Sequence, residues 1–311
     1  MGTEYLLKIA DRKAAQEKQR ISETVTKLLS DINQAMSTYI EDSELSRINR
    51  APATDWIPVS DELWEVLLEA DRISRLSNGA FDITVGPLVN LWGFGPRKVT
   101  ADMLPDENTI SRTMQTIGYK HIEYNPEGKK IRKNVPDLYI DLSGIAKGYA
   151  VDRIADILDA LGYKNYMIEI GGELRVKGRR SADRGWQVGI EKPLVDRRSV
   201  HRVIRLQDTG MATSGDYRNF FEIDGKRYSH TIDPNTGNPV THELASVSVL
   251  HDSAMTADAL ATALNVMGAE SGIQLAEERG ITAMFIKHSG KEFDEKFTGG
   301  FDRHILNTVL Q

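Results

Sequence analysis

Helical patterns fill most of the first half of this chain and strand patterns most of the second, with no regular alternation between them. The spacing of apolar residues predicts helices at 11–36, 60–77, 105–116, 144–162, 254–264 and 269–279. It predicts strands at 5–10, 129–134, 138–144, 165–172, 186–192, 200–207, 218–224, 227–233, 244–251 and 281–287. Because strict βαβ repeats are absent, we expect an α+β fold, and we find no domain boundary within residues 1–311.

Composition excludes several classes of protein. The net charge of −6 gives no electrostatic case for binding nucleic acid. The chain has no cysteine, which excludes disulfides, thiolate catalysis and cysteine-ligated metals. It has no run of about 18 apolar residues, so we expect no membrane span. No signal peptide is visible, and a leader carried by a longer precursor would be missing here.

The stretch "AMTADALATAL" (254–264) combines strong helix formers with two oxygen-bearing side chains. Asp258 and Thr262 are four residues apart, so they lie on one face of the helix, one turn apart. A carboxylate and a hydroxyl on one face form a partial ligand set for Mg²⁺ or Ca²⁺. The alternative is an ordinary helix in which Thr262 bonds back to the carbonyl of Asp258.

The stretch "YIDLSGIAKGYAVD" (139–152) predicts a strand that ends at Asp141 and a helix that begins after a Ser-Gly pair. Backbone amides at a helix N-terminus bind anions, and Lys147 adds a positive charge, so this stretch has the outline of a phosphate cradle. The spacing is not that of a P-loop. A plain strand-to-helix turn with a solvated lysine fits equally well.

Three further features suggest a ligand site without defining one. Gly171 and Gly172 end a predicted strand and allow close approach of a ligand or of another backbone segment. His230 is predicted within a strand, just before the rigid turn "DPNTGNP", and is either structural or directed at a ligand. Aromatic side chains at polar or glycine-rich loops are either packing residues or walls for a planar ligand: Trp92, Phe94 and Tyr39.

A series of motifs covers almost the whole chain in a fixed order: "MGT", "STY", "DSELSRIN", "FDITVGPLVNLWGFGP", "DLSGIAKGYAVD", "IGGELRVKG", "ATSGDYRN", "SHTIDPNTGNP" and "TADALATAL". In this order they resemble the FAD:protein FMN transferase (ApbE) family. The resemblance implies a two-lobed, T-fold-related α+β unit with FAD bound between the lobes. It also implies a Mg²⁺-dependent enzyme that cleaves FAD, attaches FMN to a threonine or serine hydroxyl of a target protein through a phosphoester bond, and releases AMP.

The resemblance also assigns roles to individual residues. It places Mg²⁺ on Asp258, Thr262 and the backbone carbonyl of Gly144. It makes His230 a candidate general base near the phosphates and Asp258 a second catalytic residue. Some members carry an aspartate after the two glycines of "IGG", whereas this chain has the longer Glu173. The residues that the resemblance places against FAD are Met1, Tyr39, Ala80, Phe81, Asp82, Asp141, Lys147 and His230.

Two other functions share these motifs. An FAD pyrophosphatase would use the same residues with water as the acceptor, and a flavin carrier would bind FAD without turnover. For the transferase, the resemblance implies acceptors with an S/T-G-A-T-like sequence in subunits of the Na⁺-translocating NADH:quinone oxidoreductase or of the Rnf complex. It further implies a periplasmic lipoprotein, which a lipid anchor on the full-length precursor would hold at the inner membrane.

Overall fold

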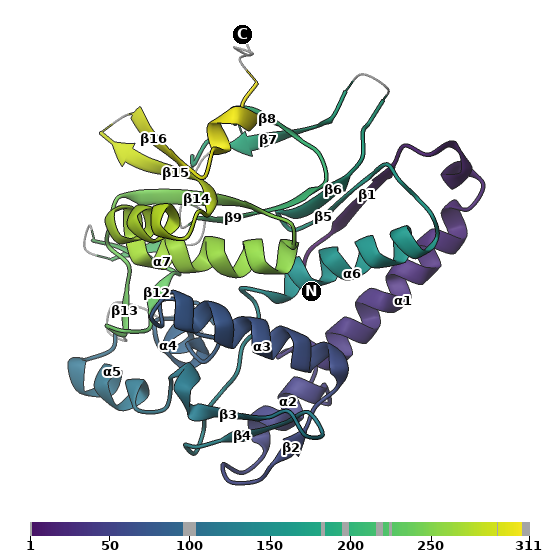
Figure 1. Ribbon diagram of the computed structural model, residues 1–311. Coiled ribbons are helices and arrows are strands. Elements are labelled where there is room, and N and C mark those ends of the chain that lie inside the picture. The colour runs from purple at the N-terminus through teal and green to yellow at the C-terminus, as the bar shows by residue number, and fades with distance from the viewer. Residues whose placement is uncertain are drawn as a thin grey trace.

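A seven-stranded antiparallel sheet is the largest element of the computed structural model, which describes residues 2–95, 104–181, 184–194, 199–215, 220–223, 226–290 and 292–306. The strands lie in the order β1-β5-β6-β9-β14-β15-β16, so segments far apart in the sequence meet side by side (Figure 1). Their bounds are β1 (Tyr5–Ile9), β5 (Tyr166–Ile170), β6 (Glu173–Lys177), β9 (Thr209–Gly215), β14 (Leu244–His251), β15 (Thr282–Ser289) and β16 (Glu292–Thr298).

Helices cover one face of this sheet in two layers (Figure 1). The inner layer consists of α6 (Ala146–Ala160) and α7 (Ala254–Glu278). Beyond it lie α1 (Lys18–Met36), α2 (Glu44–Arg50) and α3 (Asp61–Leu76), together with a small sheet of β2 (Ile57–Pro58), β4 (Lys130–Lys133) and β3 (Ile122–Asn125). No helix in the described part of the chain is long and apolar enough to cross a membrane.

Smaller elements complete the structure. The hairpin of β7 (Trp186–Glu191) and β8 (Val200–Leu206) packs its apolar side chains against the other face of the large sheet. The helices α4 (Gly86–Leu91) and α5 (Glu107–Met114) lie at one end of the helical layers (Figure 1). Two short antiparallel strand pairs follow later in the chain. They are β10 (Phe220–Ile223) with β11 (Lys226–Ser229), and β12 (Ile232–Asp233) with β13 (Asn238–Pro239).

The helices form where the apolar spacing predicts them. In α1, Ile21, Val25 and Ile32 are buried on one stripe, while the other faces are exposed. At the start of α3 the Ser60 hydroxyl accepts a hydrogen bond from the amide of Leu63, which makes Ser60 the N-cap as predicted. The α+β prediction is therefore confirmed, and helix ends differ from the prediction by only a few residues, apart from the N-terminal end of α1.

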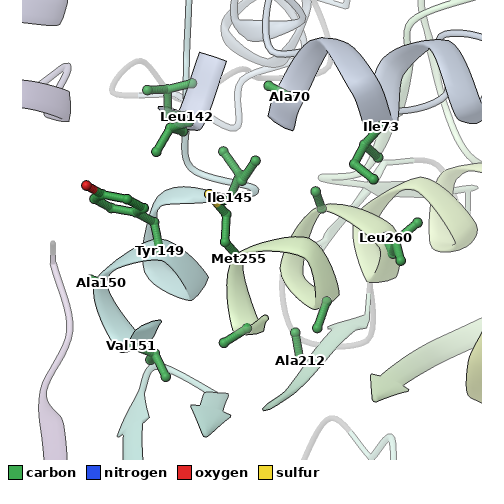
Figure 2. Close-up of a cluster of buried hydrophobic side chains, with 14 of the residues drawn as sticks. Ala70, Ile73, Leu142, Ile145, Tyr149, Ala150, Val151, Ala212, Met255 and Leu260 are labelled. Atoms are coloured by element: carbon green, nitrogen blue, oxygen red, sulfur yellow. The ribbon is translucent and has the colours of Figure 1, made fainter. Parts of the chain in front are cut away.

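The N-terminal part of α7 is enclosed on every side. Alanines dominate it, and its side chains meet those of α3, α6 and β9 in the apolar cluster that Figure 2 shows. Gly268 interrupts the helix with φ of 76° and ψ of 179°, a conformation that suits glycine. The break matches the two predicted helices, 254–264 and 269–279.

Several expectations from the sequence are wrong. Residues 138–144 are extended but form no strand, because Ile140 bonds to the side chain of Asn49 instead of to a neighbouring strand. His230 lies in a bend between β11 and β12, not within a strand. The helices α2 and α4 and the strands β6, β9 and β16 lie outside the predicted elements, although the sequence of β6 alternates polar and apolar residues.

Asp152 connects α6 to the beginning of α7. Its carboxylate accepts hydrogen bonds from the Ser253 hydroxyl at 2.7 Å and from the amides of Ala254 and Met255, each at 3.0 Å. It also pairs with Arg175 of β6. One buried carboxylate thereby satisfies amides at the first turn of α7 and joins two helices and the sheet.

We expect Asp152→Ala to lower the free energy of unfolding by about 2–4 kcal/mol, because it leaves amide donors and Arg175 without a partner. Asp156→Ala makes the same change one turn later in α6, where Asp156 forms only an exposed ion pair with Arg153. It should cost less than about 0.5 kcal/mol. Urea unfolding of both variants checks this, and equal losses would contradict the role of Asp152.

Candidate functional site

A pocket of about 500 Å³ opens where the first turns of α6 and the middle of the N-terminal part of α7 meet the end of the large sheet. It gathers residues from six separate stretches of the chain: Ala80–Val89, Asp141–Lys147, Gly171–Glu173, Thr213–Gly215, His230–Pro234 and Asp258–Val266. A second cavity of about 490 Å³, beside Arg72 and Arg279, contains none of the predicted site residues. The first pocket is therefore the candidate site.

Asp258, Thr262 and Gly144 come together at the crossing of α6 and α7. A β-carbon built on Gly144 would lie 3.4 Å from the Thr262 hydroxyl oxygen, so the α6 turn passes directly over that side chain. Asp258 is only 4% exposed and accepts a hydrogen bond from the amide of Gly148 at 3.1 Å. Within the described residues Thr262 makes no bond back to the Asp258 carbonyl. The two oxygens are thus held at the pocket, as the ligand interpretation predicts.

Lys147 lies between two buried carboxylates. Its Nζ atom is 3.5 Å from Asp258 Oδ2 and 3.3 Å from Glu173 Oε1, and it donates to the carbonyl of Ser143 at 3.1 Å. Burial alone would lower the pKa of Lys147, but the charges of Asp258 and Glu173 outweigh it and raise that pKa. The lysine therefore stays charged and places a fixed positive charge in the pocket.

Glu173 is a member of this cluster that the sequence indicated only as a departure from the family pattern. Burial, followed by the charge of Asp258, raises the pKa of Glu173 to about 8. Its second oxygen, Oε2, is buried and has no hydrogen-bond partner among the described residues. Burial also raises the pKa of Asp258, against the opposing effect of Lys147. One lysine thus faces two carboxyl groups within the pocket.

Four residues predicted to contact FAD line the same pocket: Ala80, Phe81, Asp82 and Asp141. The Asp82 carboxylate is fixed by hydrogen bonds to neighbouring residues. Its oxygens accept from the amide and hydroxyl of Thr84 and from the amide of Tyr119. Its pKa is raised by burial, against these hydrogen bonds. Asp141 accepts from the amide of Ser143 at 2.8 Å, which fixes the turn before α6. Both carboxylates therefore shape the walls.

Lys147 and His230, which are also predicted to contact FAD, line the pocket too, which leaves Tyr39 and Met1. Tyr39 is 88% exposed and does not line the pocket. It is near Tyr139, whose pKa is raised by burial and by the charges of Asp141 and Tyr39, and the Tyr139 ring lies against Gly86 of the pocket wall. Met1 is outside the described residues.

His230 reaches the pocket from an aromatic cluster. Its ring meets Phe94 edge-on with the ring centroids 6.3 Å apart, and Phe94 stacks on Phe221 at 5.0 Å. Trp92 stacks on Tyr228 and donates from Nε1 to the Gly237 carbonyl at 2.8 Å. Trp92 is therefore a buried packing residue. The cluster joins the chain around α4 to the β10–β11 hairpin, directly before His230.

Known proteins resemble this chain in sequence and in structure. The family model described as "ApbE family" matches residues 1–285. The chain belongs to the ApbE family. An FAD:protein FMN transferase of Vibrio cholerae is 45% identical over 301 residues, which cover 97% of this chain and 89% of that protein. One of Haemophilus influenzae is 41% identical over 308 residues, with coverage of 97% and 89%.

Solved ApbE structures agree. The structure titled flavinyl transferase ApbE from Pseudomonas stutzeri, apo form, superposes with a TM-score of 0.88 and 39% identity, covering 98% of this chain and 94% of that one. These matches confirm the family and the fold expected from the motifs. In this ApbE chain five of the motifs contribute residues to the pocket: "FDIT", "DLSGIAKG", "IGGE", "SHTIDP" and "TADALATAL".

We expect Lys147→Met to lower the free energy of unfolding by about 2–4 kcal/mol, because the change keeps the length of the side chain but leaves two buried carboxyl groups without their cation. Lys177→Met is the control, since Lys177 forms a partly exposed pair with Asp159, and it should cost less than about 1 kcal/mol. Denaturant titration at pH 7 measures both. A Lys147→Met protein as stable as the control would show that the buried charges are not coupled.

Proposed function

We propose that this chain is a Mg²⁺-dependent transferase that moves the FMN half of FAD to a threonine or serine hydroxyl of a protein acceptor and releases AMP. The observation that carries the proposal is the convergence of Lys147, Asp258, Thr262 and His230 on one pocket in a chain 45% identical to a protein named FAD:protein FMN transferase. A carrier that only binds flavin has no need of this buried charged cluster.

The residues present fit a magnesium ion. Asp258, Thr262 and Gly144 supply hard oxygen donors from residues that line the pocket, and the unpartnered Glu173 oxygen belongs to a residue of the same lining. No three histidine, aspartate or glutamate side chains within the described ranges converge as a metal cage. Mg²⁺ usually takes one or two carboxylates and completes its shell with phosphate oxygens and water. When bound, it would neutralise charge on the pyrophosphate.

The protein's own groups then act on the phosphates and the acceptor. Lys147 and the first turn of α6 provide positive potential for the diphosphate of FAD. The acceptor oxygen attacks the phosphorus of FMN and forms a phosphoester bond, while the bond from that phosphorus to the bridging oxygen breaks and AMP leaves with it. His230 takes the proton of the attacking hydroxyl. Phe81, Ala80 and Asp141 form a wall for the flavin half, and the family resemblance adds Tyr39 and Met1 as contacts of FAD.

For the acceptor and the location, we propose what the family resemblance implies. The acceptors are redox subunits with an S/T-G-A-T-like sequence, such as those of the Na⁺-translocating NADH:quinone oxidoreductase or of the Rnf complex. The protein acts in the periplasm, held at the inner membrane by a lipid anchor of the precursor. Support for both comes from the resemblance carried by the motifs.

Mass spectrometry tests the transferase directly. After incubation with FAD and Mg²⁺, a domain that carries an S-G-A-T sequence should gain the mass of FMN minus water on its threonine. Asp258→Asn should raise the Mg²⁺ concentration for half-maximal labelling at least about tenfold, because a ligand is lost. Asp252→Asn changes a nearby aspartate outside this pocket and should leave that concentration unchanged. Release of FMN and AMP without labelling would instead identify a pyrophosphatase.

We expect His230→Gln to lower kcat for labelling by roughly 10²–10⁴-fold, the usual contribution of a general base, with the Kd for FAD changed less than about threefold. The control is His288→Gln, which changes another histidine that lies against a phenylalanine ring but on β15, away from the pocket. Stopped-time labelling and flavin fluorescence measure the two quantities. An unchanged kcat would assign proton removal to another group.

A further inference from the structure

The large sheet has an open edge at β1. In the described part of the chain β1 pairs only with β5, in an antiparallel register from Tyr5 opposite Ile170 to Ile9 opposite Tyr166. The amide of Ala10 donates to the carbonyl of Asn165. This bond shows which residues of β1 direct their backbone groups toward β5. Even-numbered residues of β1 therefore bond to β5, and the backbone groups of Tyr5, Leu7 and Ile9 point away from it.

This edge is apolar and accessible, unlike the opposite one. Tyr5 is 37% exposed and Leu6 is 41% exposed, and Lys8 is the only charged residue of the strand. At the other end of the sheet, β16 reads "EFDEKFT", and its Glu295 is paired with His201 and Arg202 of β8. Charged side chains of this kind protect edges from further pairing. The β1 edge carries one charged side chain, Lys8, against four in β16.

The open edge begins at the pocket. A β-carbon built on Gly171, which lines the pocket, would lie 3.1 Å from the side chain of Thr3, two residues before β1. The same position is 3.5 Å from Cδ of Lys147. A strand added beside β1 would therefore reach the pocket entrance at the Thr3 end, next to the lysine of the charged cluster.

We propose that the segment of the acceptor protein that carries the reacting hydroxyl binds as an additional strand on the free edge of β1. This rests on the proposed function, which requires a polypeptide to enter this pocket. Backbone hydrogen bonds to Tyr5, Leu7 and Ile9 supply affinity that depends little on the acceptor's sequence, while Tyr5 and Leu6 offer apolar contact. The edge thus selects an extended chain and delivers its hydroxyl to the phosphates.

The test compares two changes at one position. Tyr5→Pro removes an outward amide and leaves the bonds to β5 in place, since proline is tolerated on the open side of an edge strand. Tyr5→Ala removes only the side chain. With the acceptor domain, FAD and Mg²⁺, Tyr5→Pro should raise KM for the acceptor roughly three- to tenfold above that of Tyr5→Ala, the worth of one backbone hydrogen bond. The Kd for FAD and the kcat at saturating acceptor should be equal in the two variants.

A second measurement uses the wild-type enzyme, so it does not depend on whether a variant folds. An acceptor domain with valine in place of the reacting threonine binds without reacting, and hydrogen exchange of the wild-type enzyme should then slow at the amides of Tyr5, Leu7 and Ile9. Equal KM values for both variants together with unchanged exchange in β1 would overturn the proposal, and so would protection caused by dimerisation alone. Failure of the wild-type enzyme to label any acceptor would overturn the proposed function first.

Discussion

The close crossing of α6 and α7 is the constraint on which the site depends. A β-carbon at Gly148 would lie 2.2 Å from the carbonyl oxygen of Ala254, so only glycine lets the two backbones approach this far. The approach places the Gly148 amide on Asp258 and the α6 turn over Thr262. Asp152, in the middle of α6, then holds the beginning of α7 through its first amides. The geometry of the pocket is therefore set by backbone contact, which is stiffer than contact between long side chains.

The charges follow from that packing. Because α6 and α7 exclude water, Lys147 and its two carboxyl neighbours interact at short range in a poorly solvated place. The carboxyl groups respond with raised pKa values, and the lysine with a firmly held proton. Burial of these groups lowers the free energy of unfolding when nothing is bound. A bound cation and diphosphate would raise it by interacting with the buried charges. Binding and folding are thereby coupled at one point.

The sequence located the residues that line the pocket better than the elements around them. The spacing of Asp258 and Thr262 requires only a helix, and the helix formers around them guarantee one. The strand β9 was not predicted because its sequence, "TGMATSG", consists mainly of small residues. These residues are small because α7 packs directly on the strand. A β-carbon at Gly210 would lie 2.9 Å from the amide of Ala254. Local pattern cannot reveal such a constraint, since it is imposed by a helix more than forty residues later.

Long-range partners explain the other differences. Residues 138–144 have the composition of a strand, yet Asn49 satisfies both backbone groups of Ile140 from 91 residues away. Glu173 shows the same limit for the site, because its burial beside Lys147 depends on how β6 lies against α6.

The parts of the site differ in how they are supported, and this separates its functions. Asp258, Thr262 and Lys147 lie on two helices packed against the centre of the sheet, where a change in backbone position is costly. His230 follows a hairpin held mainly by stacked aromatic rings, and β1 lies at the margin of the sheet with one side open. Under the proposed function, the groups that would hold the phosphates belong to the packed interior. The proposed proton acceptor and the proposed docking strand belong to the end of the hairpin and to the edge of the sheet.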